Sequence, residues 1–240
     1  MIHTIFTKVL IEPIYNVFVT LITYIPGHDA GIAIILLTLI LRAIFLPTFA
    51  QAMRTQHAMK SVEDELAEIN KKHKDNPTER GRMTMELFKE NNIRPFASML
   101  ALLIQLPVFI ALYAVFLREG FPALSQGLLY SFTPLPSSIQ VLFLGFLNLT
   151  HNHLIPLAIL VALVQYTQSR ISAGAMPKST DPQKEQMMTM QRQMLMYFLP
   201  FMMGFITYTL PAAAGLYLMT NALVSVVQEL LIAQKYRKVA

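Results

Sequence analysis

The chain has 240 residues, of which 54% are hydrophobic and only 14% are charged. Soluble domains carry about 25% charged residues, so this composition indicates an integral membrane protein. The absence of cysteine excludes thiol catalysis, cysteine-ligated metals, disulfides and a lipidated N-terminal cysteine. The formal net charge of +5 would suit a nucleic-acid binder, but the basic residues are grouped as membrane topology requires, so no nucleic-acid partner is expected.

Residues 1–28 predict a helix that lies on the membrane surface. The stretch Val9–Ile25 is apolar, but Lys8 and Glu12 interrupt its start. We therefore expect an amphipathic interfacial helix, with a membrane span as the alternative. No small-residue cleavage site follows a clean apolar core, so a removable signal peptide is not expected.

Five apolar segments are each near the roughly 20 residues that a helix needs to cross the hydrocarbon core. In chain order they are residues 30–50, 96–117, 154–171, 194–210 and 212–233. They predict an all-α, polytopic membrane protein, a five-span bundle whose core is residues 29–240. The apolar run 139–149 is too short to cross and is expected to lie on the membrane surface.

Residues 51–95 form a highly charged segment between the first two expected spans. Apolar residues recur near helical spacing in both of its halves. Asp75–Thr78 reads as a turn, and Pro77 suits the first positions of a following helix. The segment therefore predicts a hairpin of two amphipathic helices in water, and a merely solvated linker is the alternative.

The basic residues predict the orientation of the chain. They concentrate in the hairpin, in the loop after the third span (which includes Lys178) and in the tail (which includes Lys238). The segment from Glu119 to His153 contains no lysine or arginine. The positive-inside rule then places the hairpin and the C-terminus in the cytoplasm.

Arg42 puts a full positive charge inside the first expected span. Such a charge at mid-bilayer costs from ~2.5 to more than 10 kcal/mol, so it needs compensation. We expect no carboxylate in the apolar part of the other spans to pair with it. Arg42 is therefore interpreted as facing a hydrated cavity that receives an anionic group. Snorkelling or a purely structural contact is the alternative.

Other polar residues recur along single helical faces of the expected spans. Two glutamines three residues apart share a face of the third span, and polar residues follow one another every three or four positions along the last. Hydrogen bonding between helices is the alternative explanation. The pattern favours a hydrophilic substrate groove formed by Arg42, Thr38, Gln105, Gln165, Gln168, Tyr217, Asn221 and Ser225.

No catalytic residue, cofactor or metal site is expected. The chain contains no phosphate-binding loop, no HExxH and no GxSxG motif. His151 and His153 could suggest a metal pair, but a polar loop explains them better.

Several ordered motifs resemble one family. They are Lys74-Asp-Asn-Pro77, Glu86-Leu-Phe-Lys-Glu-Asn-Asn-Ile-Arg-Pro95, Ile104-Gln-Leu-Pro-Val-Phe109, Leu41-Arg42-Ala43 and Gly215-Leu-Tyr-Leu-Met-Thr-Asn221. From about Pro13 to Tyr236 the chain resembles the YidC membrane protein insertases of the YidC/Oxa/Alb superfamily, in the short bacterial form without a large periplasmic domain.

This resemblance implies a bacterial plasma-membrane insertase, not an enzyme. It implies a groove open to cytoplasm and lipid that binds nascent membrane protein segments and releases them into the bilayer without nucleotide hydrolysis. Arg42 matches the positive residue of that groove, Gln168 a polar position, and Tyr217 an aromatic position that is often Trp. The implied partners are these segments and the lipid bilayer, and the chain is expected to be a monomer.

The ribosome and the Sec translocon are further partners that the family resemblance suggests. Only six residues follow Gln234, which leaves docking of a ribosome by the tail open. A small-solute or anion transporter or channel is the rival function, and an intramembrane protease is a third. No inverted repeat with paired broken spans supports a transporter.

Overall fold

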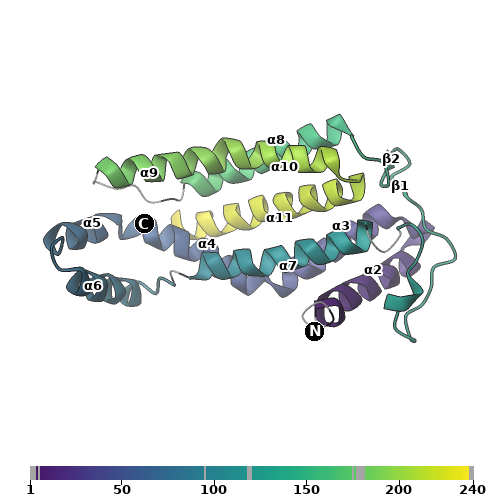
Figure 1. The fold of residues 1–240 in the computed structure, drawn as a ribbon, viewed down its shortest axis with the longest axis horizontal. Coiled ribbons are helices and arrows are strands. Elements are labelled where there is room, and N and C mark those ends of the chain that lie inside the picture. Colours follow the sequence, from purple (N-terminus) through teal and green to yellow (C-terminus); the bar gives the residue numbers. More distant parts are fainter. Residues whose placement is uncertain are drawn as a thin grey trace. The chain divides into compact units, whose positions relative to one another are not determined.

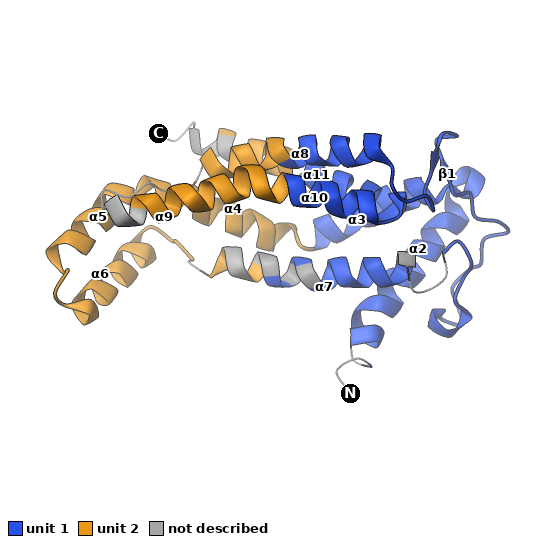
Figure 2. Cartoon of the chain, turned by 45° about the horizontal axis from the view of Figure 1, so that its top comes forward, with its two compact units in different colours: residues 1–44, 103–165, 201–224 blue, residues 45–102, 166–200, 225–240 orange. Residues whose placement is uncertain are grey.

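The structure is a computed structural model that describes residues 4, 6–94, 96–117, 121–174, 176 and 182–237. Four residues used in the sequence predictions, Pro95, Glu119, Lys178 and Lys238, lie outside the described residues. The described chain is mostly helical (Figure 1), which confirms the predicted helical class. It forms two compact units, coloured separately in Figure 2. Unit 1 comprises residues 1–44, 103–165 and 201–224, and unit 2 comprises residues 45–102, 166–200 and 225–240.

The elements follow one another along the chain with short connections in most places. The helices are α2 (Glu12–Tyr24), α3 (Ala30–Ile44), α4 (Leu46–Ser61), α5 (Glu63–Lys72), α6 (Pro77–Glu90), α7 (Ala97–Leu117), α8 (Ile155–Gly174), α9 (Pro182–Gln193), α10 (Leu199–Thr209) and α11 (Ala212–Arg237). Short helical turns are η1 (Thr7–Ile11), η2 (Pro26–His28), η3 (Gln126–Leu128) and η4 (Met194–Phe198). The sequence did not predict the antiparallel strands β1 (Leu142–Phe143) and β2 (Leu147–Asn148).

In unit 1, the N-terminal helix packs by one face on the next helix. Phe18, Val19 and Ile22 of α2 are buried, as are Ile34 and Leu37 of α3, and the two helices are in contact. The apolar face of α2 is therefore partly covered by protein. The predicted interfacial position of residues 1–28 stays a prediction.

Asn16 joins α2 to the long loop that follows α7. Its side-chain amide donates to the carbonyl of Leu128 at 2.7 Å, and its oxygen accepts from the Tyr130 backbone N–H at 2.8 Å and the Thr133 hydroxyl at 2.6 Å. A buried amide needs such partners because an unsatisfied polar group in an apolar setting costs free energy. Asn16 therefore helps to hold in place a loop that contains little regular structure.

Asp29 lies directly before α3 and binds both the first turn of that helix and the turn between β1 and β2. Its carboxylate accepts from the backbone N–H groups of Gly31 at 2.7 Å, Ile32 at 3.1 Å and Leu144 at 3.2 Å. Asp is a preferred N-cap because its oxygen satisfies the free N–H groups of the first turn. Phe143 lies directly against Gly31, where a Cβ atom would overlap its ring. The predicted surface run 139–149 therefore packs partly on α3.

The predicted first span, residues 30–50, is divided in the structure. Helix α3 ends at Ile44 in unit 1, and a separate helix, α4, begins at Leu46 in unit 2. Pro47 in the first turn of α4 explains the break. Proline has no N–H to continue the helix and its ring clashes with the carbonyl four residues earlier. The sequence contains Pro47, but the apolar run on both sides of it predicted one continuous span.

Helix α11 contains a stretch, Ala212–Ile232, that is long and apolar enough to cross a membrane. Among the described residues no other single helix passes the same test, and α3 with α4 passes only as a bent pair. The prediction of five spans is therefore not confirmed and stays a prediction.

In unit 2, α5 and α6 form the pair of helices that the charged segment predicts. Asn76 precedes α6, and its side chain accepts from the Glu79 N–H at 3.2 Å, while Pro77 lies in the first turn. The pair has its own small core, in which Val62, Leu87, Phe88 and Ile93 are buried and Ala58, Met59, Leu66 and Ile69 pack against them. The turn and the two apolar stripes account for this hairpin.

Candidate functional site

Arg42 is buried in unit 1, on the last turn of α3. Only 6% of the residue is exposed, although the sequence predicted an arginine in an open, hydrated groove. Its Nε donates to the side-chain oxygen of Asn221 at 2.8 Å, and its Nη2 donates to the Asn221 backbone carbonyl at 3.0 Å. The guanidinium therefore joins α3 to α11.

The contact with Asn221 satisfies two guanidinium donors without neutralising their charge. Both acceptors are amide oxygens, whereas a guanidinium carries five N–H donors and a full positive charge. A carboxylate would add to these hydrogen bonds the attraction between opposite charges, which an amide oxygen lacks. A carboxylate that reached Arg42 could therefore displace the Asn221 side chain.

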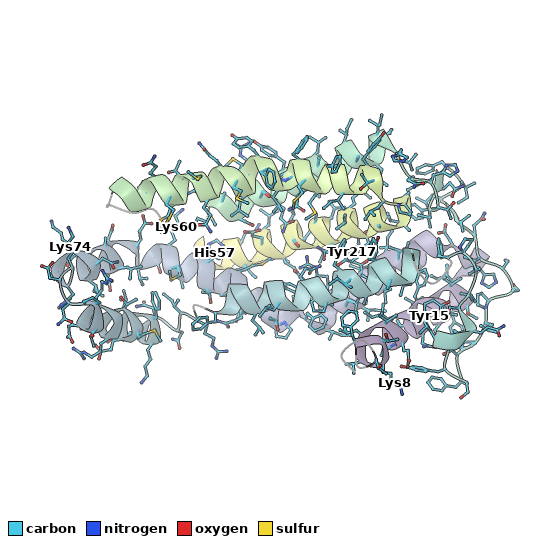
Figure 3. All side chains as sticks on the ribbon, viewed as in Figure 1. Lys8, Tyr15, His57, Lys60, Lys74 and Tyr217 are labelled. Carbon is cyan, nitrogen blue, oxygen red and sulfur yellow. The ribbon has the colours of Figure 1, made fainter. Side chains whose placement is uncertain are left out.

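Tyr217 lies one turn before Asn221 on α11 and is also buried. Its hydroxyl accepts from the Gln105 side-chain amide of α7 at 2.8 Å, and its ring lies 6.3 Å from that of Phe109. It is close enough to Arg42 for an electrostatic interaction between the two side chains. Figure 3 labels Tyr217 toward the start of α11, at the right-hand side of that ribbon. The structure thus brings Arg42, Asn221, Tyr217 and Gln105 together.

Thr38 lies one turn before Arg42 on α3 and is buried. Its hydroxyl donates to the carbonyl of Ile34 in the same helix at 2.7 Å. This local bond is the usual way in which a threonine satisfies its hydroxyl inside a helix. Thr38 therefore adds polarity beside Arg42, but its donor is already used.

The remaining predicted groove residues lie elsewhere on α8 and α11. Gln165 is half-buried in unit 1, and Gln168 is half-buried in unit 2. Ser225 is buried in unit 2, one turn after Asn221 on α11. Their predicted role in substrate binding stays a prediction.

Sequence reasoning missed a buried carboxylate, Glu229, near the end of α11. It is only 1% exposed, and the Ser172 hydroxyl of α8 donates to its Oε2 at 2.8 Å. The expectation that the spans contain no carboxylate overlooked this residue, which lies inside the predicted span 212–233. An acidic residue among apolar neighbours was the available signal, since such residues mark function by default.

Within the described ranges, no three His, Asp or Glu side chains gather closely enough to hold a metal ion. The His153 ring instead packs on Tyr208 with ring centroids 4.9 Å apart.

The comparisons with known proteins cover almost the whole chain. A profile of the family described as 60Kd inner membrane protein matches residues 21–239. A membrane protein insertase YidC of Oceanobacillus iheyensis is 32% identical over 219 residues, which are 88% of this chain and 79% of that protein.

Two longer relatives also carry the name membrane protein insertase YidC. That of Endomicrobium trichonymphae is 27% identical over 208 residues, 87% of this chain and 37% of that protein. That of Francisella tularensis subsp. novicida is 28% identical over 207 residues, 86% of this chain and 33% of that protein. The chain thus spans about a third of each longer relative. These relatives are named for the insertion of membrane proteins and not for a chemical reaction, and the extent of the profile match shows that the chain belongs to the 60Kd inner membrane protein family of the bacterial plasma membrane.

Proposed function

We propose that this chain inserts membrane proteins by receiving the polar end of a nascent segment at Arg42 and releasing its apolar part into lipid. The observation that carries the proposal is the guanidinium held between α3 and α11 by the uncharged oxygens of Asn221. Because the Asn221 oxygens are uncharged, an acidic group that replaces them at Arg42 breaks no salt bridge with Asn221.

The energetic scale fits a transient contact. Attraction between unit charges 4 Å apart is ~4 kcal/mol at an effective dielectric of about 20, before desolvation costs are subtracted. A substrate carboxylate gains this attraction but must replace the Asn221 side chain. The balance favours capture of an acidic tail without trapping it.

Release is driven by the apolar part of the segment. Hydrocarbon burial contributes roughly 25 cal/mol for each Å² of apolar surface. The membrane potential adds ~2.3 kcal/mol per charge per 100 mV when an acidic tail moves outward. These two terms supply the driving force, so the proposed mechanism uses no nucleotide.

The hairpin of unit 2 is proposed to meet the incoming segment first. A hollow of about 460 Å³ there is lined by Arg82, Met85, Glu86, Phe88, Lys89 and Ile93. Its floor is apolar and its rim is charged, as a surface for brief contact with amphipathic chains requires. The proposal includes a topology of five spans with the hairpin and the C-terminus in the cytoplasm. It also includes a monomeric protein that works with the ribosome and the Sec translocon.

Replacing Arg42 tests the proposal in vesicles that contain only this protein. We expect Arg42→Ala to slow insertion of a substrate with a short acidic tail about tenfold, equivalent to about 1.4 kcal/mol. Arg42→Lys keeps the charge and should retain most of the rate. A matched substrate with a neutral tail is the control and should distinguish the variants little.

Equal insertion of the acidic substrate by the original chain and by Arg42→Ala would contradict the proposed role of Arg42. The same vesicles, loaded with chloride, test the rival function. Rapid chloride release that depends on Arg42 would favour an anion channel instead.

A further inference from the structure

The ends of α8 and α11 meet in unit 2 through polar side chains. The Ser172 hydroxyl donates to the Glu229 carboxylate at 2.8 Å, and Ser225, one turn before Glu229, is also buried. Within the described ranges, Ser172 is the one hydrogen-bond partner of Glu229 that the structure gives. Because burial of a carboxylate costs far more than a single hydroxyl bond returns, cohesion between the helices does not explain this residue.

A second hydroxyl lies on the same face of α8 without a partner. Ser169 is 4% exposed, and its Oγ makes no hydrogen bond. It precedes Ser172 by three residues, so the two side chains are neighbours with Cβ atoms about 5–6 Å apart. An unsatisfied buried polar atom in a folded protein calls for an explanation.

The two helices run in the same direction. Gly215 of α11 lies beside Leu157 of α8 near the start of both helices, and Ser172 bonds Glu229 near their ends. A displacement along their common direction would therefore carry Glu229 from Ser172 toward Ser169. The displacement needed is at most three residues, which is about 4.5 Å of helix.

We propose that Glu229 is a positioning residue that moves its hydrogen bond between Ser172 and Ser169 while a substrate passes. The two hydroxyls define two discrete arrangements of α8 and α11, and the buried carboxylate keeps one hydrogen bond in each. Shear of packed helices between such arrangements is a known form of conformational change.

The proposal assigns the contact between α8 and α11 a role in insertion. It rests on the proposed function. Both helices also present exposed apolar side chains, such as Leu163 of α8 and Leu231 of α11, which suit lipid contact. If the two helices have two defined arrangements, they can shift to the second one while an apolar segment passes and then return to the first.

Ser169→Ala removes the second hydroxyl while leaving the bond between Ser172 and Glu229 intact. We expect the thermal stability to stay the same or rise, because the variant deletes an unsatisfied buried group. We expect insertion of both acidic-tailed and neutral-tailed substrates to slow about fivefold, as for the loss of one ordinary hydrogen bond in the second arrangement. Ser169→Thr keeps a hydroxyl and should restore the rate.

Thr55→Ala is the matched control. Thr55 of α4 also has a buried hydroxyl without a hydrogen bond, but it does not lie on α8 or α11. Removing it should leave the insertion rate unchanged. An equal loss of activity in Thr55→Ala and Ser169→Ala would overturn the specific role of Ser169.

The displacement itself is measured by electron spin resonance. The chain has no cysteine, so spin labels can be attached at Arg170→Cys of α8 and Gln234→Cys of α11, both exposed positions. We expect one distance population without substrate and a second one with a stalled substrate. The second population should be lost in Ser169→Ala.

A single population under all conditions would overturn the proposed displacement, whatever Arg42→Ala does. Conversely, two populations together with normal insertion by Arg42→Ala would leave the displacement standing and contradict only the role of Arg42. The two proposals therefore fail separately.

Discussion

At the scale of single residues, Asn221 occupies the place at Arg42 that a substrate carboxylate is proposed to take. Its side-chain oxygen accepts from Nε at 2.8 Å. The strength of this contact sets how readily Arg42 becomes available. An acceptor that is too strong would keep the guanidinium from the substrate.

Asn221→Asp tests this competition. The new carboxylate should pair with Arg42, raise the thermal stability and slow insertion of an acidic-tailed substrate about tenfold, since the attraction between opposite charges then opposes its displacement. Rates in vesicles and melting curves in detergent measure the two effects. Asn221→Ala is the control, because it removes the competing acceptor and should slow insertion much less. Faster insertion by Asn221→Asp would contradict the competition.

The sequence revealed Arg42 because a charge in an apolar run is conspicuous. Its partner Asn221 was placed on the expected polar face of the last span, but periodicity gives only the face of a helix and not the residue across it. The close contact with Asn221 and the burial of Arg42 therefore could not be predicted. Glu229 was within reach of the same reasoning and was overlooked.

At the scale of elements, the first turns of α11 pack closely against α8 and α10. A Cβ atom on Gly215 would lie 2.7 Å from Thr207 Cγ2 and 2.8 Å from Leu157 Cδ2. Such distances are too short for ordinary contact, so a larger residue must displace the Thr207 and Leu157 side chains or the helices that carry them. This glycine therefore helps to set the position of Tyr217 and Asn221 further along α11.

Gly215→Ala should destabilise the protein by about 1–3 kcal/mol through overpacking. Gly81→Ala is the matched control, because a Cβ on Gly81 of α6 meets no atom within 4 Å. Alanine there should be neutral or stabilising by about 0.5–1 kcal/mol, as alanine favours helix interiors. Melting temperatures of both variants in detergent measure the difference. A Gly215→Ala protein as stable as the original chain would refute the close packing.

The hairpin offers a pH-dependent contact. Arg82 donates to Glu79 at 2.6 Å and to Glu86 at 2.7 Å on the exposed surface of α6. The hydrogen bond from Arg82 lowers the pKa of the Glu79 carboxyl below its ordinary 4.5. Because the folded pKa is the lower one, the stabilisation is present above pH 4.5 and is lost as the pH falls through the folded value.

Arg82→Gln should therefore raise the pKa of Glu79 toward its ordinary value, and carbon NMR of labelled glutamate carboxyls can follow it. Lys72→Gln is the control, since Lys72 bonds Glu68 in α5 and not Glu79. An unchanged titration of Glu79 in Arg82→Gln would show that the contact is not formed in solution.

Local signals explain why the hairpin was predictable and other elements were not. The turn before Pro77 and the apolar stripes of α5 and α6 are encoded within a few residues of each other. The sheet of β1 and β2 depends instead on distant contacts, such as Asp29 with Leu144 at 3.2 Å. Residue propensity and hydrophobic periodicity carry no information about contacts between distant residues. The sequence therefore predicted only an apolar surface segment at residues 139–149.

At the scale of the whole molecule, the family assignment and the buried charge support one another. The profile match over residues 21–239 places the chain among the 60Kd inner membrane proteins, and Arg42 is the buried charge that we propose attracts a polypeptide. Composition and the distribution of basic residues predicted a membrane protein of this class. The number of spans depends on where apolar helices break, as at Phe45.

Charge reversal in vesicles without a membrane potential tests the central claim most directly. Arg42→Glu is assayed with two otherwise identical substrates, one with an acidic tail and one with a basic tail. If Arg42 attracts the tail by its charge, Arg42→Glu should insert the acidic substrate about tenfold more slowly than the original chain does, and the basic tail should restore most of the rate. Equal insertion of the two substrates by Arg42→Glu would contradict the account.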